Sequence, residues 1–270
     1  MAISIILATA FVKHRRRISA YQHVAVQELQ DANEMQMSLM PETAPEIEGV
    51  EIAGKCIPAN TVSGDFFDYL EGKHPNEIGL VIADVSGKAM KGAMNAVMAD
   101  GILRASAQEI DRFSPAFLMM KVNNVLKGRM EQYMNVTMVI GVIDSDANTL
   151  KLTNAAHHAY PLLLREGEIQ TLKGGGLPLG MRVGIKYSEE RFPLQTGDVL
   201  FLMTDGIIEA QDSEGQMYSD SGRLDETISK FTLDLSAEAM VEAIINDAID
   251  FGGDKTARDD DMTVVVAKIK

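Results

Sequence analysis

Hydrophobic and polar positions divide the chain into strand-like runs and helical stretches. Short apolar runs bounded by turn residues predict strands, which fall at residues 50–57, 77–85, 135–143, 149–153, 160–165, 168–172, 197–204 and 262–269. Helical spacing predicts helices over 87–107, from the N-cap candidate Ser114 to about 130, and from Ser236 to about 250. Short Asp-Ala-Asn and Glu-Gly turns join the four strands between 135 and 172 and predict an antiparallel meander. The mixture predicts an α+β fold.

A long amphipathic helix is predicted before the strands. Residues 18–40 contain neither glycine nor proline, and Pro41 and Pro45 end the helical stretch. An approximate heptad seam, interrupted by Glu28, runs through Ile18, Tyr21, Ala25, Ala32, Met35 and Leu39. Such a helix either packs on its own domain or dimerises and transmits a signal. We therefore expect three regions: residues 1–17, a linker helix at 18–42, and a globular domain at 43–270.

The first seventeen residues join an apolar run to a basic cluster. Residues 1–12 are predominantly apolar, and residues 13–17 read Lys-His-Arg-Arg-Arg, which is typical of the cytoplasmic exit of a membrane segment. Twelve helical residues rise only about 18 Å against a hydrocarbon core of about 30 Å, so this run is too short to span alone. Three interpretations stay open: the end of a longer transmembrane helix, a surface anchor, or the start of a soluble helix. A signal peptide is disfavoured because the charges follow the apolar run.

Composition narrows the function classes. A chain of 270 residues with 46% hydrophobic content is large enough for a real core. Its 25 basic and 39 acidic residues give a net charge of −14, which disfavours nucleic acid as a partner. The one cysteine, Cys56, fits a reducing cytoplasm. Val62 stands where a cysteine phosphatase would need an arginine, so Cys56 is predicted to be a small buried residue.

Four aspartates stand out by their positions. Asp84 and Asp205 each end an apolar run, Asp260 lies just before one, and Asp65 lies in a Ser-Gly-Asp turn. Carboxylates gathered at strand ends repel one another unless a cation neutralises them, and hard divalent ions prefer oxygen ligands. The pattern predicts metal-assisted chemistry, although an Asp-Gly pair such as 205–206 taken alone is more often a turn.

Six motifs then occur in the order found in one enzyme family. They are Ser-Gly-Asp-Phe-Phe-Asp-Tyr at 63–69, Ala-Asp-Val-Ser-Gly-Lys at 83–88, Asn-Ala-Ala-His-His at 154–158, Leu-Pro-Leu-Gly at 177–180, the run with Met-Thr-Asp-Gly at 197–210, and Asp-Asp-Met-Thr at 260–263. From about residue 30 onward the chain resembles the bacterial sporulation and stress-response branch of the PP2C-like (PPM) metal-dependent phosphatases. The resemblance implies an αββα sandwich, in which two antiparallel sheets are flanked by helices, behind an N-terminal linker helix.

The resemblance also implies a ligand set for two Mn²⁺ or Mg²⁺ ions. Asp84 would bridge both ions, Asp205 and Asp260 would complete the first, and Asp65 and the backbone carbonyl of Val85 would hold the second. Asp84 and Asp205 would then be catalytic through a metal-bound water. Two ions about 3.5 to 4 Å apart activate such a water for in-line attack and neutralise the phosphoryl oxygens.

The chain departs from the family pattern at two places. Lys88 and Ala89 stand where relatives often carry histidine or lysine followed by glycine, and Ala156 replaces the usual glycine of an Asn-Ala-Gly-His turn. Ala156 would strain that turn if its φ were positive. Lys88 is interpreted either as a solvated lysine at a helix start or as a contact for the substrate phosphate.

Four further polar residues lie near the proposed ligands. His157 and His158 are adjacent, so on a strand they point to opposite faces and are poorly placed to share one ion. We predict turn and packing roles for both. Asp68 and Asp261 are expected to support the ligands or to face solvent, and contact with a metal or its bound water is the alternative for either residue.

The resemblance implies a protein serine/threonine phosphatase, and the single cysteine together with the segment at 1–17 predicts that it lies in the cytoplasm or at the inner face of the membrane. Its implied substrate is a phosphorylated bacterial signalling protein, an anti-sigma-factor antagonist. One alternative is a catalytically silent module acting through its N-terminal helix, against which the four retained aspartates argue; another is a structural metal or calcium protein. We further expect a homodimer through residues 18–40 that positions the 87–107 helix, and a membrane tether at 1–17.

Overall fold

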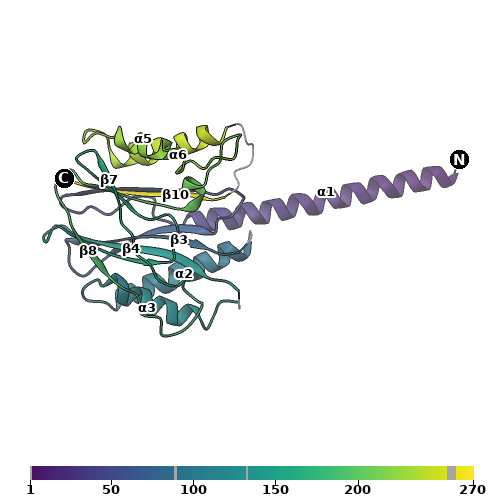
Figure 1. Cartoon of the computed structure of the whole chain (residues 1–270). Helices are drawn as coiled ribbons and strands as arrows, with labels where there is room; N and C mark the ends of the chain where they lie inside the picture. Colours follow the sequence, from purple (N-terminus) through teal and green to yellow (C-terminus); the bar gives the residue numbers. More distant parts are fainter. Residues whose placement is uncertain (1, 88–89, 132, 254–259) are drawn as a thin grey trace.

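Two five-stranded antiparallel sheets lie face to face between two layers of helices in the computed structural model, which describes residues 2–87, 90–131, 133–253 and 260–270 (Figure 1). The first sheet has the order β1 (Val50–Ile57), β10 (Met262–Ile269), β9 (Val199–Met203), β6 (Leu162–Arg165) and β7 (Glu168–Thr171). The second has the order β2 (Asp65–Glu71), β3 (Glu77–Val85), β4 (Val136–Asp144), β5 (Thr149–Ala155) and β8 (Glu190–Pro193). The predicted α+β class and αββα sandwich are confirmed.

Helices cover the outer face of each sheet. α2 (Met90–Gln108) and α3 (Pro115–Leu126) pack on the second sheet, whereas α5 (Arg223–Ser229) and α6 (Ala237–Gly252) pack on the first. The single turn α4 (Asp205–Ile208) directly follows β9. Ser114 and Ser236 are the N-caps predicted for α3 and α6, since their hydroxyls accept hydrogen bonds from the N–H groups of Phe117 and Ala239.

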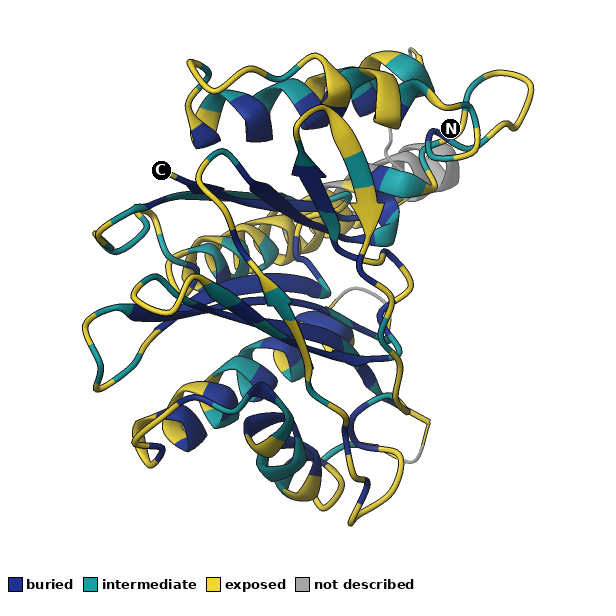
Figure 2. Ribbon diagram, turned by 60° about the vertical axis from the view of Figure 1, so that its left-hand side comes forward, coloured by how far each residue is buried: buried dark blue, intermediate teal, exposed yellow. Residues whose placement is uncertain are grey.

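The period of two along the strands builds two apolar layers. In β9 and β10, Leu200, Leu202, Val265 and Ala267 face the layer between the sheets, while the alternate residues Val199, Phe201, Val264 and Val266 face α6. Figure 2 shows these central strands buried on both faces. The two ends of the sandwich are therefore where polar side chains gather without disturbing the core.

The predicted antiparallel meander is wrong in its connections. β4 and β5 belong to the second sheet, but β6 and β7 belong to the first, so the chain crosses between sheets after β5. The side chain of Asn154 makes the crossing turn, because its amide donates to the carbonyl of His157 and its oxygen accepts from the N–H of His157. β2 and β8 were not predicted, whereas β1, β3 and β10 have the bounds that were expected.

Ala156 lies in this turn with φ at +57°, in the left-handed region. The strain predicted for a non-glycine residue there is therefore confirmed. We expect Ala156→Gly to stabilise the protein by about 0.5 to 1 kcal/mol, because left-handed backbone costs alanine more than glycine loses through its flexible unfolded chain. Urea unfolding measures the change. Ala147→Gly, in an exposed turn without positive φ, should instead lose stability, and a loss in the Ala156 variant would contradict the argument.

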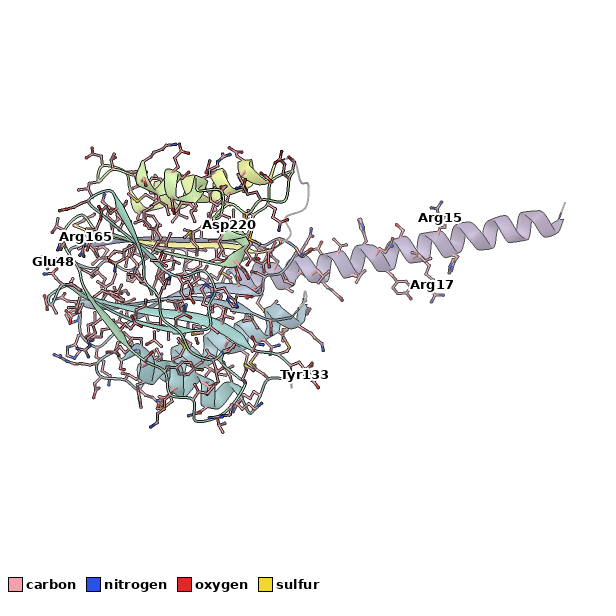
Figure 3. All side chains as sticks on the ribbon, in the orientation of Figure 1. Arg15, Arg17, Glu48, Tyr133, Arg165 and Asp220 are labelled. Carbon is pink, nitrogen blue, oxygen red and sulfur yellow. The ribbon has the colours of Figure 1, made fainter. Side chains whose placement is uncertain are left out.

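A single helix, α1 (Ala2–Met37), forms the N-terminal part of the chain and projects away from the sandwich (Figure 1). It continues through the basic cluster, and Figure 3 shows Arg15 and Arg17 on its projecting part, far from Glu48 and Arg165. Its C-terminal turn belongs to the packed body, since Gln36 and Met40 are buried. Within the described residues, no helix combines the length and the apolar character needed to cross a membrane.

A candidate metal centre at one end of the sandwich

Strand pairing brings the four predicted carboxylates to the same end of the sandwich. Asp65 opens β2 and lies opposite Asp84 in the register between β2 and β3. Asp205 follows the end of β9, and Asp260 precedes the start of β10. Because β9 and β10 pair antiparallel with Met203 opposite Val264, these two positions share one edge. Hydrogen bonds from Thr204 and Thr263 to Asp65 then join this edge to the second sheet.

The electrostatics at this end are those of a crowded acidic site. Burial, followed by the charges of Asp205, Asp260 and Asp261, raises the pKa of Asp84 to about 7. Burial and the charge of Asp84 hold the pKa of Asp65 well above its ordinary range, and burial together with Asp205 raises the pKa of Asp260. Burial is the larger cause of each shift, and the charges of neighbouring carboxylates add to it; a bound cation would relieve that repulsion.

The donor set fits hard divalent ions in kind, although the side chains do not yet converge on one point. Throughout the parts of the chain that the structure describes, no three histidine, cysteine or acidic side chains lie close enough together to hold an ion as they stand. Oxygens of Asp65, Asp205 and Asp260 instead accept hydrogen bonds from hydroxyl or backbone donors. Oxygen-only ligands suit Mn²⁺ and Mg²⁺. The grouping of these residues as ligands stays a prediction.

The carbonyl of Val85 is brought to the site by a close approach of two backbones. The N–H of Val85 donates to the carbonyl of Gly64 over 3.2 Å. A Cβ atom at position 64 would lie 2.9 Å from the Val85 oxygen. Glycine at 64 therefore keeps that carbonyl accessible beside Asp65, where the resemblance places it as a ligand.

Asp261 holds the loop that carries Asp65. It is almost buried, and its two carboxylate oxygens accept hydrogen bonds of 2.7 Å from the N–H groups of Ala59 and Gly64. The supporting role is therefore confirmed over the solvated one. Nothing in the sequence indicated that Thr204 and Thr263 contact Asp65. The available signal was their position, since Thr204 lies next to Asp205 and Thr263 lies three residues after Asp260.

His157 has a structural role, as predicted. Its ring is buried, its Nε2 lies 2.8 Å from the carbonyl of Met203, and its Nδ1 lies 3.0 Å from the hydroxyl of Thr137. A carbonyl only accepts, so Nε2 donates and Nδ1 accepts. Burial lowers the pKa of His157 and keeps the ring neutral. Both nitrogens are occupied, while His158 is exposed.

Cys56 is the buried residue that the sequence predicted. Burial and the charge of Asp65 raise the pKa of its thiol to about 12, so it is no thiolate nucleophile at neutral pH. Lys88 and Ala89 lie outside the described residues.

Asp68 is fully buried at the junction of α1, α2 and β2. Its Oδ1 accepts a 2.5 Å hydrogen bond from Arg104, whose guanidinium also contacts Asp100 and the Leu39 carbonyl. Oδ2 of Asp68 and Oδ1 of Asp100 are buried without any other partner. Burial and the charge of Asp100, opposed by Arg104, raise the pKa of Asp68 to about 7. We infer that the two carboxyl groups share one proton, because such a proton would satisfy both unpartnered oxygens.

This pair predicts a pH-dependent stability that Asp68→Asn removes. The folded-state pKa of Asp68 lies above its unfolded value, so its stabilisation is complete below about pH 4 and is lost as pH rises through about 7. Asparagine imitates the protonated acid by donating to Asp100. At pH 8 we expect Asp68→Asn to be about 1 to 2 kcal/mol more stable than the wild type, and at pH 5 to be nearly equal.

Urea unfolding at pH 5, 6, 7 and 8 measures that difference. Other carboxylates titrate in both proteins, so comparing the variant with the wild type isolates Asp68. The exposed Asp234→Asn serves as the control and should follow the wild type at every pH. A variant less stable than the wild type at pH 8 would contradict the shared proton.

Comparisons with known proteins agree with this fold and these motifs. The family model of Stage II sporulation protein E (SpoIIE) matches residues 74–270. Phosphoserine phosphatase RsbU of Bacillus subtilis (strain 168) is 23% identical over 207 residues, or 76% of this chain and 60% of that protein. Protein IcfG of Synechocystis sp. is 25% identical over 264 residues, or 88% of this chain and 41% of that protein. The chain thus spans less than two thirds of either relative.

Solved structures share the sandwich at low identity. The SiaA-PP2C domain of Pseudomonas aeruginosa superposes with a TM-score of 0.78 at 20% identity, covering 93% of this chain and 99% of that one. The catalytic domain of the serine threonine protein phosphatase PstP, solved in complex with two manganese ions, has a TM-score of 0.58 at 17% identity, covering 82% and 98%. At these identities the likeness shows the fold.

Proposed function

The chain belongs to the SpoIIE family of PP2C-type domains, and from this premise we propose that it is a metal-dependent protein serine/threonine phosphatase. The single observation that carries the proposal is the gathering of Asp65, Asp84, Asp205 and Asp260 at one end of the sandwich, where burial and the charges of neighbouring carboxylates raise the pKa of Asp65, Asp84 and Asp260. A protein without bound cations gains nothing from such repulsion. The name of the phosphoserine phosphatase RsbU supports the choice of substrate group.

In this proposal Asp84 would be the ligand shared by two Mn²⁺ or Mg²⁺ ions, Asp205 and Asp260 would complete the first, and Asp65 and the Val85 carbonyl would hold the second. Such ions lower the pKa of a bound water and neutralise charge on a phosphoryl group. The chain's own part is to fix the ligands. Asp261 pins the loop before Asp65 through the N–H groups of Ala59 and Gly64, and His157 ties the end of β9, two residues before Asp205, to the second sheet.

Phosphate release from phosphorylated proteins tests the activity. The full chain should release phosphate from phosphoserine or phosphothreonine proteins with Mn²⁺ present, lose that activity in EDTA and regain it when Mn²⁺ is restored. Failure of Mn²⁺ to stimulate release from any phosphoprotein or aryl phosphate would end the proposal. Within this function, the substrate we propose is an anti-sigma-factor antagonist, tested by assaying phosphorylated antagonists encoded in the same genome as the chain.

Two other functions make different predictions in the same experiments. A catalytically silent module would bind a partner without releasing phosphate. A structural calcium protein would bind Ca²⁺ tightly in calorimetry and show no turnover with Mn²⁺. The four acidic residues and their repulsion favour a cation site over the silent module, and the match to the SpoIIE family favours the enzyme over the calcium protein.

For regulation, we propose that α1 forms a homodimer through its heptad seam. Large apolar residues of the seam are exposed on the projecting helix, with Tyr21 at 62% and Met35 at 71%. Hydrogen bonds connect this helix directly to the loop that precedes Asp65. The amide of Gln36 donates to the Ser63 carbonyl over 2.6 Å and accepts from the Ser63 N–H over 3.0 Å. A movement of α1 would therefore displace Ser63, two residues before Asp65. It would also displace α2, because Arg104 of α2 donates a hydrogen bond to the Leu39 carbonyl just after α1.

A charged residue on the seam tests this dimer. We expect Tyr21→Glu to shift the chain from dimer to monomer in sedimentation equilibrium by at least about tenfold in dissociation constant, because two like charges would meet in an apolar contact. The exposed Val26, which lies away from the seam at an outward-facing heptad position, provides the matched control Val26→Glu. Phosphate release should fall with dimer content. A wild type that is monomeric at every concentration would refute the proposal.

We also propose that residues 1–17 tether the chain to the inner face of the membrane. The support is the apolar run followed by the basic cluster that includes Arg15 and Arg17. Flotation of the full chain with anionic vesicles tests it. Absence of flotation by the full chain would overturn the tether, and equal flotation after glutamate replaces both arginines would show that the basic cluster is not its cause.

A further inference from the structure

We propose that Thr204 and Thr263 form a two-hydroxyl clamp that positions Asp65 for ion binding. This inference rests on the proposed two-metal phosphatase, and it assigns a role to two residues that the ligand set does not include. Thr204 Oγ1 donates to Asp65 Oδ2 over 2.6 Å, and Thr263 Oγ1 donates to the same oxygen over 2.8 Å. All three side chains are essentially removed from solvent.

The direction of these hydrogen bonds follows from their partners. The N–H of Thr263 donates to Thr204 Oγ1 over 3.0 Å, so that oxygen is already an acceptor. Its own hydrogen goes to Asp65 Oδ2 at 2.6 Å, since the other acceptor within reach, the Asp261 carbonyl, is 3.4 Å away. The N–H of Thr204 in turn donates to the Thr263 carbonyl over 3.0 Å, which locks the two threonines together. Both hydroxyls engage Oδ2, so Oδ1 is the oxygen of Asp65 that is left for an ion.

The clamp connects ligands that lie on different sheets. Asp65 begins β2 in the second sheet, whereas Thr204 follows β9 and Thr263 lies in β10 of the first sheet. Thr204 is the residue before Asp205, and Thr263 lies three residues after Asp260. Fixing Asp65 to these two threonines therefore fixes the distance between the ligands proposed for the two ions. A side chain so held loses little freedom when an ion binds.

Packing alone would not require two hydroxyls here. Valine has the shape of threonine and would fill the same space, but it would leave Oδ2 of a buried carboxylate without donors. A third hydroxyl nearby, that of Ser63, donates to the backbone carbonyl of Asp65 and accepts from the Asp65 N–H. It therefore holds the backbone of Asp65 and not its carboxylate. The two threonines are the hydroxyl donors to this carboxylate among the described residues.

Calorimetric titration of Mn²⁺ into the full chain tests the clamp without depending on turnover. Thr204→Val and Thr263→Val should each weaken one of the two Mn²⁺ binding steps by about 10-fold to 100-fold, while Thr204→Ser and Thr263→Ser should stay within about threefold of the wild type. Thr153→Val is the matched control. Its buried hydroxyl donates to the Ser188 carbonyl at another edge of the sheet, so its loss should lower the unfolding temperature and leave Mn²⁺ binding unchanged.

Each outcome bears on a distinct statement. If the wild type binds no Mn²⁺, the proposed metal centre fails. If the wild type binds two ions and both valine variants bind them equally well, the metal centre stands and the clamp is wrong. If a serine variant binds as weakly as its valine counterpart, the hydroxyl is not the cause and the clamp is again wrong. Should a valine variant fail to fold, the alanine variant at that position takes its place under the same expectations.

Discussion

Asp84→Asn is expected to abolish phosphate release and, at the same time, to stabilise the metal-free protein at pH 7 to 8. Asp84 is proposed to bridge both ions, so replacing one carboxylate oxygen with an amide nitrogen removes a shared anionic ligand. We expect a loss of at least about a thousandfold in kcat, since removal of one preorganised electrostatic contact alone costs about a hundredfold to a thousandfold. Phosphate release with saturating Mn²⁺ measures it.

The gain in stability has the same physical origin. Burial and three neighbouring carboxylates disfavour the ionised form of Asp84 and raise its pKa to about 7. A neutral asparagine of nearly equal size carries none of that repulsion, so the thermal midpoint of the metal-free variant should rise above that of the wild type. Opposed changes in activity and stability separate loss of a functional group from loss of the fold.

Two controls complete the experiment. Asp205→Asn should lose activity similarly, because Asp205 is proposed to bind the first ion. The exposed Asp234→Asn should change neither turnover nor the thermal midpoint. Turnover close to that of the wild type in the Asp84 variant would count decisively against the assignment of the centre.

The sequence predicted those strands whose apolar character is continuous. β3 and β10 are almost wholly apolar, so their bounds could be read directly. β2 was missed because its seven residues include Asp65, Asp68 and Glu71. The carboxylates of Asp65 and Asp68 are buried only because Thr204 after β9, Thr263 in β10 and Arg104 in α2 donate hydrogen bonds to them. Those partners are distant in sequence, and spacing alone does not reveal them.

The connection between the sheets was beyond the sequence pattern for a related reason. Short turns between neighbouring strands are compatible with a meander in one sheet and equally with a crossing to the other. What decides is the turn at Asn154 and Ala156, whose side-chain hydrogen bonds and positive φ redirect the chain. The resemblance supplied the sandwich, whereas local propensity gave only α+β.

At the candidate centre, sequence reasoning found carboxylates better than it found their supports. Asp84 and Asp205 stand out because each interrupts an apolar run at its end. Thr204 and Thr263 look like ordinary β-branched strand residues, and their role depends on which oxygen faces them across the sandwich. Asp261 was recognised only as a neighbour of Asp260. The residues that hold the ligands in place can therefore be identified only from the three-dimensional structure.

Gly206→Ala is expected to damage the centre through backbone contact alone. A Cβ atom at position 206 would lie 2.0 Å from the carbonyl oxygen of Asp261 and 2.8 Å from its carbonyl carbon. Neither atom is the flexible end of a side chain, so the segment carrying Asp260 and Asp261 must move away from Asp205. We expect a loss of about 1 to 3 kcal/mol in the free energy of unfolding and a fall of at least about a hundredfold in kcat, since a displacement near 1 Å suffices for that.

A second glycine separates this effect from a general response to alanine. Gly101 lies in α2, and a methyl group added there would meet no atom within 4 Å outside its own helix backbone, so Gly101→Ala should gain up to about 1 kcal/mol from helix propensity and keep normal turnover. Mn²⁺ titration of the Gly206 variant distinguishes displaced ligands from global unfolding, because a folded variant with displaced Asp260 should bind Mn²⁺ weakly while keeping its circular dichroism. Wild-type Mn²⁺ affinity and turnover in Gly206→Ala would contradict this prediction. They would mean that the segment before β10 can move aside without displacing Asp260 from its place beside Asp205.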